Sequence, residues 1–197
     1  MLIFWEQGLV LLATPKTGST AIAAALGPLA TVRLGQPTAL KHTSVHRYHR
    51  FIAPYLAASS GRQFEVVALM REPIDWLGSW YRYRLRADLP DPARSTAHMS
   101  FDDFLRAYCS DPQPEFAAVG SQARFLRPRQ GAGVDHLFRY ENMKGFIRFF
   151  EERLETTIDL PRRNVSPQAS LDLSPATQIL ARKQLAPDLA LYEGLSR

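Results

Sequence analysis

Lysine, glycine and four hydroxyl side chains occur together in the short polar segment 14–20, which reads TPKTGST. The segment follows the apolar run 9–13 and precedes the alanine-rich run 21–26, and this order predicts a strand, a loop and a helix. The first N–H groups of a helix lack internal partners and the macrodipole is positive there, so an anion can bind. Gly18 would let the backbone approach closely, and Lys16 would add a full charge. The segment therefore indicates a phosphate or sulfate site.

The spacing within this segment differs from that of the ATP-binding P-loop. That motif requires Gly-x-x-x-x-Gly-Lys-[Ser/Thr], whereas Lys16 stands two residues before Gly18. The order proline, lysine, x, glycine and two hydroxyl residues resembles instead the 5′-phosphosulfate loop of sulfotransferases that use PAPS, 3′-phosphoadenosine-5′-phosphosulfate. The resemblance implies a donor-binding set of Pro15, Lys16, Thr17, Gly18, Ser19 and Thr20. The alternative is an ordinary strand-to-helix turn with a solvated lysine.

A second candidate anion site follows the apolar segment 64–70, which is rich in β-branched residues and predicts a strand. Arg71 ends this strand, and Pro73 favours the first turn of a helix. Ser79 comes eight positions after Arg71, about two helical turns, so both could reach one phosphate. Arg-x-Pro followed by serine at this interval resembles the 3′-phosphate motif of sulfotransferases. The alternative is an Arg71 paired with a carboxylate and a Ser79 that faces a neighbouring helix.

A third resemblance lies near the C-terminus. The basic loop with Arg162, Asn164 and Ser166 resembles the segment that covers the nucleotide in Golgi-type carbohydrate sulfotransferases, and 188–192 resembles their closing Asp-x-x-Leu-Tyr helix. The resemblance therefore implies that these three residues bind the donor, in a small bacterial-type enzyme similar to carbohydrate sulfotransferases. The segment 85–133 matches no motif, and an acceptor site would be free to vary there.

Sulfuryl transfer requires charge stabilisation on the leaving phosphate and a base for the acceptor hydroxyl. Lys16 suits the first role. His42 suits the second, because its intrinsic pKa is near neutral and it ends a predicted strand. The equally plain alternative is a structural histidine bonded to the backbone. Glu72 and Asp75 are the fallback bases.

Alternating apolar segments predict the elements that would position these residues. Helical spacing is found over 44–61, 73–85, 100–108, 142–154, 174–185 and 187–195, and strand patterns over 1–5, 30–34, 64–70 and 134–140. This alternation predicts an α/β fold, and with the motifs it implies a three-layer α/β/α sulfotransferase fold, P-loop-nucleotide-hydrolase-like, with a central parallel sheet. Ligands gather at the carboxyl ends of parallel strands, so Lys16, His42 and Arg71 would line one crevice.

Composition sets broader limits. The 197 residues suit a single sulfotransferase-like domain spanning 1–197, and 24 Lys and Arg against 19 Asp and Glu give a net charge of +5, which favours anionic ligands. One cysteine, Cys109, excludes an intramolecular disulfide, and no Cys/His spacing indicates a metal. The N-terminal apolar run lacks a basic flank and is shorter than the ~20 residues that cross a bilayer. A soluble cytoplasmic protein without a membrane partner is expected.

The basic and aromatic run 81–86 is interpreted as a solvated helix face, so no nucleic-acid partner is expected. The sequence thus predicts an enzyme that moves a sulfuryl group from PAPS to a hydroxyl or amine of a small-molecule or carbohydrate acceptor. The product would be PAP, and no metal is expected. The alternatives are a nucleotide or small-molecule kinase with a degenerate P-loop and a non-catalytic nucleotide-binding module. Acceptor identity and oligomeric state stay open.

Overall fold

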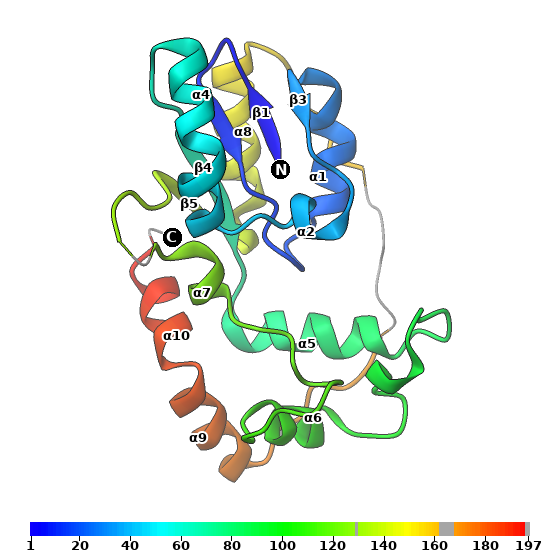
Figure 1. Ribbon diagram of the computed structural model, residues 1–197. Coiled ribbons are helices and arrows are strands. Elements are labelled where there is room, and N and C mark those ends of the chain that lie inside the picture. Colours follow the sequence, from blue (N-terminus) through cyan, green and yellow to red (C-terminus); the bar gives the residue numbers. More distant parts are fainter. Residues whose placement is uncertain (129, 162–167, 196–197) are drawn as a thin grey trace. The chain divides into compact units, whose positions relative to one another are not determined.

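The computed structural model describes residues 1–128, 130–161 and 168–195, and in them the chain forms a mixed α/β structure (Figure 1). The described strands build one five-stranded sheet in the order β3-β1-β2-β4-β5. Their bounds are Leu2–Phe4 for β1, Leu9–Leu11 for β2, Val32–Arg33 for β3, Glu65–Met70 for β4 and His136–Arg139 for β5.

The prediction of a parallel sheet is correct for one half of the strand order only. Strands β2, β4 and β5 are parallel neighbours, but β1 runs antiparallel to both β2 and β3. The connection between β1 and β2 is a tight turn in which the Gly8 N–H donates to the Trp5 carbonyl at 3.1 Å. Gly8 adopts a positive φ of 62°, which glycine tolerates at little cost. So short a connection can form a hairpin but no parallel crossover, which needs a dozen or more residues.

The chain packs as two compact units, and the expectation of a single domain stays a prediction. The described residues of the first unit are 1–71, 122–128, 130–161 and Leu195, and those of the second are 72–121 and 168–194. The helices of the first unit are α1 (Ser19–Leu26), α2 (Thr38–Lys41), α3 (Val45–Arg47), α4 (Ala53–Ser60), α7 (Gln122–Leu126) and α8 (Met143–Leu154). Shorter turns in this unit are the 3-10 turns η1 (Gly27–Leu29) and η4 (Tyr140–Asn142) and the π-helical turn η2 (Tyr48–Ile52).

The helix predicted over 44–61 is confirmed, with one irregular turn inside it. Ser44 caps its start by accepting from the Arg47 N–H at 3.5 Å, and Gly61 ends it in the left-handed conformation at φ 71°. The strand predicted to end at His42 is wrong. Residues Thr38–Lys41 form the helical turn α2 instead, and His42 is its C-terminal cap. The Pro37 before this turn has a fixed φ that suits a helix start.

The core of the first unit lies between the sheet and two helices, α1 and α8. Alternate side chains of the strands point to this face, because successive residues of a strand face opposite ways. The buried members of this core are Leu2, Phe4, Leu9, Leu11, Ile22, Leu26, Val67, Leu69, Phe146, Phe150 and Ile158. Burying one such side chain contributes roughly 1.5–3 kcal/mol. This packing fixes α1, and therefore the position of its N-terminus.

The second unit is helical in its described part. It comprises α5 (Pro73–Arg84), the 3-10 turn η3 (Pro92–Arg94), α6 (Phe101–Tyr108), α9 (Pro175–Gln184) and α10 (Ala186–Glu193). A capping box of Ser100 and Asp103 starts α6, as the sequence pattern indicates. Gly78 in α5 lies so close to Leu171 that a Cβ there would stand 2.6 Å from Leu171 Cδ1. None of the described helices has the length and apolar character needed to cross a bilayer.

Candidate anion-binding site

The predicted loop joins β2 to α1 at the carboxyl edge of the sheet. Helix α1 begins at Ser19, and Gly18 precedes it in the left-handed conformation at φ 72°. Lys16 also has a positive φ, 64°, which a non-glycine residue adopts rarely. No side chain among the described residues caps α1, so its first N–H groups are left for another partner. The buried Thr14 hydroxyl likewise has no hydrogen-bond partner in the described chain. These orphaned donors fit an anionic group at the loop.

Arg71 comes to this loop from the neighbouring strand β4. Its Nη1 donates to the Lys16 carbonyl at 3.3 Å, and its guanidinium carbon lies 4.7 Å from the centre of the Tyr140 ring. A Cβ on Gly18 would stand 3.4 Å from Tyr140 Cε2, so glycine makes room for the ring. The predicted meeting of Lys16 and Arg71 at one edge is thus present in the geometry. Tyr140 follows β5 directly, and the sequence analysis missed it.

Gln122 holds the backbone of Arg71 in place. Its Oε1 accepts from the Arg71 N–H at 2.9 Å, and its Nε2 donates to the Arg71 carbonyl at 2.8 Å. The Gln122 side chain is buried at 1% exposure, where unsatisfied amide groups would be costly. These two hydrogen bonds, the Gln122 clasp, continue the hydrogen bonding of β4 past its last residue and orient Arg71. No local sequence signal identifies a glutamine fifty-one positions away as its partner.

His42 joins the same edge although its predicted strand does not exist. Its Nδ1 lies 2.6 Å from the carbonyl of Ala13, which follows β2. A carbonyl only accepts, so Nδ1 carries the proton, and in the neutral ring Nε2 is an acceptor. Partial burial lowers the pKa of His42 below its ordinary value, and the charge of Lys41 lowers it further, while the bond to Ala13 opposes both. The ring is therefore neutral at pH 7, as a general base must be.

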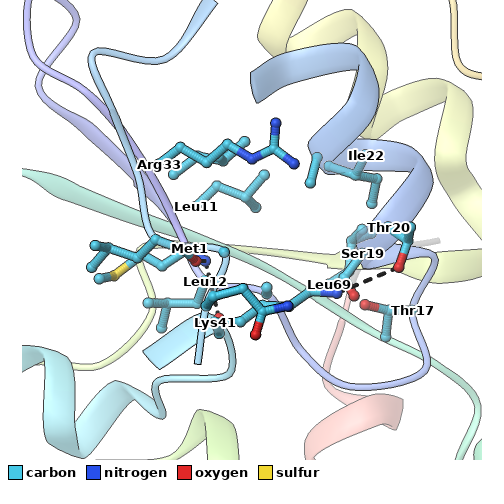
Figure 2. Close-up of a pocket in the computed structure, with 16 residues that line it drawn as sticks. Met1, Leu11, Leu12, Thr17, Ser19, Thr20, Ile22, Arg33, Lys41 and Leu69 are labelled. Carbon is cyan, nitrogen blue, oxygen red and sulfur yellow. Dashed lines mark hydrogen bonds between the residues drawn. The ribbon is translucent and has the colours of Figure 1, made fainter. Parts of the chain in front are cut away.

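Lys41 is a site residue that the sequence analysis did not select. Its Nζ lies 3.4 Å from the hydroxyl of Thr20, in the first turn of α1 (Figure 2). A cation at the positive end of a helix dipole is electrostatically unfavourable on its own. A bound anion would reverse the sign of that interaction. The geometry thus adds a second lysine to the loop, brought there by α2.

A cavity of about 380 Å³ opens beside the loop, within the first unit (Figure 2). Loop and helix residues Thr17, Ser19 and Thr20 line it, together with the cations Arg33 and Lys41. Most of the remaining wall is aliphatic and comes from β1, β2, β4 and α1. No acidic side chain lines it among the described residues. The charged side chains that line the cavity are therefore cations, and much of the rest of its wall is aliphatic.

The other predicted site residues stay predictions. Ser79 is buried in α5 of the second unit, so its pairing with Arg71 of the first unit stays a prediction. Arg162, Asn164 and Ser166 lie outside the described residues.

The two fallback bases have structural partners. Glu72 caps α5 by accepting from the Asp75 N–H at 2.7 Å, and Asp75 pairs with Arg82 at 3.3 Å. Carboxylates at a helix start interact favourably with its dipole. Glu72 and Asp75 therefore have structural roles, as His42 also has through its bond to the Ala13 carbonyl.

Among the described residues, no group of three or more His, Cys, Asp or Glu side chains is arranged to hold a metal ion. Comparison with protein-family models, with curated proteins and with solved structures finds no match. The case for a function therefore depends on the motifs and on the geometry of the loop.

Proposed function

We propose that the chain transfers a sulfuryl group from PAPS to a hydroxyl or amine of a small molecule or carbohydrate, on a three-layer, P-loop-like sulfotransferase fold. The supporting observation is the convergence of Lys16, Arg71 and His42 on one loop between β2 and α1. Lys16 belongs to the loop, whereas Arg71 and His42 come from two other segments and contact its backbone at the Lys16 and Ala13 carbonyls. Such convergence favours a reaction centre over an ordinary turn, in which the lysine would have no such neighbours.

The donor's 5′-phosphosulfate would lie against the first turn of α1. The uncapped N–H groups there, with the hydroxyls of Ser19 and Thr20, supply donors for its oxygens. Lys16 would hold the phosphate that leaves, where negative charge grows during the reaction. Arg71 donates to the Lys16 carbonyl, so that carbonyl already has a cationic partner beside the proposed anion site. PAPS, when bound, supplies the sulfuryl group, whose S–O bond to that phosphate breaks as a bond to the acceptor forms.

His42 would take the acceptor's proton at Nε2. The bond from Nδ1–H to the Ala13 carbonyl fixes the tautomer and the ring orientation, and it stabilises the imidazolium that results. Burial keeps the pKa below its ordinary value, so the unprotonated base is available at neutral pH. The proton leaves the acceptor hydroxyl as its oxygen bonds to sulfur. The positive charge of Lys16 would stabilise the negative charge that grows on the departing phosphate.

Ligand-dependent melting tests this function against its alternatives. PAP and PAPS should raise the melting temperature without magnesium, because a ligand at one hundred times its dissociation constant stabilises by about 2.7 kcal/mol. ATP should act much less. A kinase would instead respond to ATP with magnesium, and a binding module would bind PAP but form no sulfated product from PAPS. Arg47, an exposed arginine of α3, provides the control variant Arg47→Gln, which should respond as wild type does.

No shift with PAP, or an equal magnesium-dependent shift with ATP, would overturn the proposal. Lys16→Ala should weaken the PAP shift only modestly, since the charge on Lys16 matters most during transfer.

A further inference from the structure

The cavity beside the loop carries two cations that are separated along α1. Lys41 reaches the first turn of α1 at Thr20. Arg33 lies at the other end of this helix, because a Cβ on Gly27 would stand 3.3 Å from Arg33 Nη1. Seven residues separate Thr20 from Gly27, and a rise of 1.5 Å per residue makes this about 10 Å. The glycine leaves space for the guanidinium, and the negative end of the helix dipole favours it there.

The wall between these two cations is largely aliphatic, apart from the amino group of Met1, which donates to the Leu34 and Lys41 carbonyls. Leu11, Ile22 and Leu69 line the cavity and are at most 4% exposed. In Figure 2, Arg33 and Lys41 lie on opposite sides of Leu11. A ligand along α1 would therefore meet the loop at one end, aliphatic side chains in the middle and a guanidinium at the far end. A carboxylate suits that guanidinium, because both groups are planar and can form two parallel hydrogen bonds.

The loop end of the cavity is the end at which His42 acts in the proposed function. Ala13, whose carbonyl binds the His42 ring, lines the cavity, and so does Lys41, the neighbour of His42 in the chain. An acceptor hydroxyl placed there would be close to both the base and the loop. No aromatic side chain that could stack on a purine lines the cavity in the part of the chain that the structure describes. These features favour an acceptor over a nucleotide base.

We infer that this cavity binds the acceptor, and that the acceptor is a small amphipathic anion: a hydroxyl or amine at one end, an apolar body, and a carboxylate at the other end against Arg33. This inference rests on the proposed function and names its substrate class. A volume of about 380 Å³ is at the small end of ligand sites, so it suits a single aryl or short alkyl body rather than a polysaccharide chain.

The test compares two probes of nearly the same shape, one charged and one neutral: 3-(4-hydroxyphenyl)propanoate and its primary amide. Calorimetric titration measures their binding with and without saturating PAP. The carboxylate should bind wild type about tenfold more tightly than the amide, as a charge-assisted pair at a partly exposed site would give. Arg33→Gln should abolish this preference and Arg33→Lys should keep part of it. Arg47→Gln, at an exposed arginine that does not line the cavity, should leave it unchanged.

Equal binding of the two probes, an unchanged preference in Arg33→Gln, or no binding of either probe at millimolar concentration would overturn the inference. Competitive displacement of the carboxylate by PAP would also overturn it, because the cavity would then hold the nucleotide. A second variant, Ala23→Phe, fills the cavity from α1 and should block both probes. The proposed function fails separately: a protein that binds the carboxylate through Arg33 but shows no PAP-dependent melting shift has an anion pocket and no donor site.

Discussion

His42→Asn separates two roles of this histidine: the hydrogen bond that Nδ1–H donates to the Ala13 carbonyl, and the proposed action of Nε2 as a base. The Asn side-chain N–H can occupy the position of Nδ1–H and donate to the Ala13 carbonyl, while nothing replaces Nε2. If Nε2 is the base, turnover should fall by roughly 10²- to 10⁴-fold with little change in folding or in PAP affinity. Single-turnover formation of sulfated 3-(4-hydroxyphenyl)propanoate, after mixing with PAPS, measures this rate.

His42→Ala provides the structural comparison. It removes the 2.6 Å bond as well as the base, and leaves a partly buried carbonyl without its partner. A net hydrogen bond contributes about 0.5–1.5 kcal/mol and an unsatisfied acceptor adds to the loss, so we expect His42→Ala to lower the free energy of unfolding by ~1–2 kcal/mol. His42→Asn should stay within ~0.5 kcal/mol of wild type. Urea denaturation followed by fluorescence resolves the difference.

The pH dependence of the same rate provides an independent check. Protonation inactivates a base, so the rate should fall as pH drops through the His42 pKa and should be flat above it. Burial and Lys41 lower that pKa below its ordinary value of 6.5, so the fall should begin only at more acidic pH. Lys41→Gln removes one of these causes and should move the fall toward higher pH. The fall should be absent in His42→Asn.

One result would refute this reasoning directly. If His42→Asn transfers sulfuryl groups at nearly the wild-type rate while remaining folded and able to bind PAP, the base lies elsewhere. The same follows if turnover in the two variants falls only in step with their loss of stability, because the histidine would then be structural.

The remaining predictions concern the loop and the second unit. Lys16→Ala should lower turnover more than PAP affinity, and equal losses in the two titrations would contradict a catalytic role. Lys16→Gly should be more stable than Lys16→Ala by about 1 kcal/mol in urea, because the position has a φ of 64°; equal stabilities would argue against that conformation. Arg71→Lys should weaken PAP binding about tenfold in calorimetry, since the planar fork is lost, whereas Arg47→Lys should not. Gly78→Ala should reduce the free energy of unfolding by roughly 1–3 kcal/mol through its clash with Leu171, and adding Leu171→Ala should remove that further effect; a neutral Gly78→Ala would disprove the close packing.

Local signals in the sequence were sufficient for much of the fold. The apolar run before Lys16 and the alanine-rich run after Gly18 identify β2 and α1, because the change from strand to helix lies within a few residues. Pro73 marks the start of α5, and the apolar spacing over 142–154 identifies α8. Each of these features is determined by residues close together in the sequence, so the local sequence pattern is enough to predict it.

Contacts between distant segments account for what was missed. The antiparallel pairing of β1 with the distant β3 is one that no single segment encodes. Lys41 reaches Thr20 only because α2 forms where a strand was expected. Tyr140 and Gln122 meet Arg71 across long stretches of chain. Single-residue reasoning selected Arg71 and His42 correctly as neighbours of the loop, but not the residues that orient them.

The clasp of Gln122 on Arg71 also bears on how the protein could change over generations. Segment 72–121 departs from the first unit directly after Arg71 and returns directly before Gln122, and two hydrogen bonds tie these points together. A segment with tied ends is attached as a domain insertion is, and such attachments tolerate exchange. Doubling the length of a flexible closed loop costs only about 0.6 kcal/mol. A lineage could therefore lengthen, shorten or replace this segment while the strands keep their register and the anion loop keeps its shape.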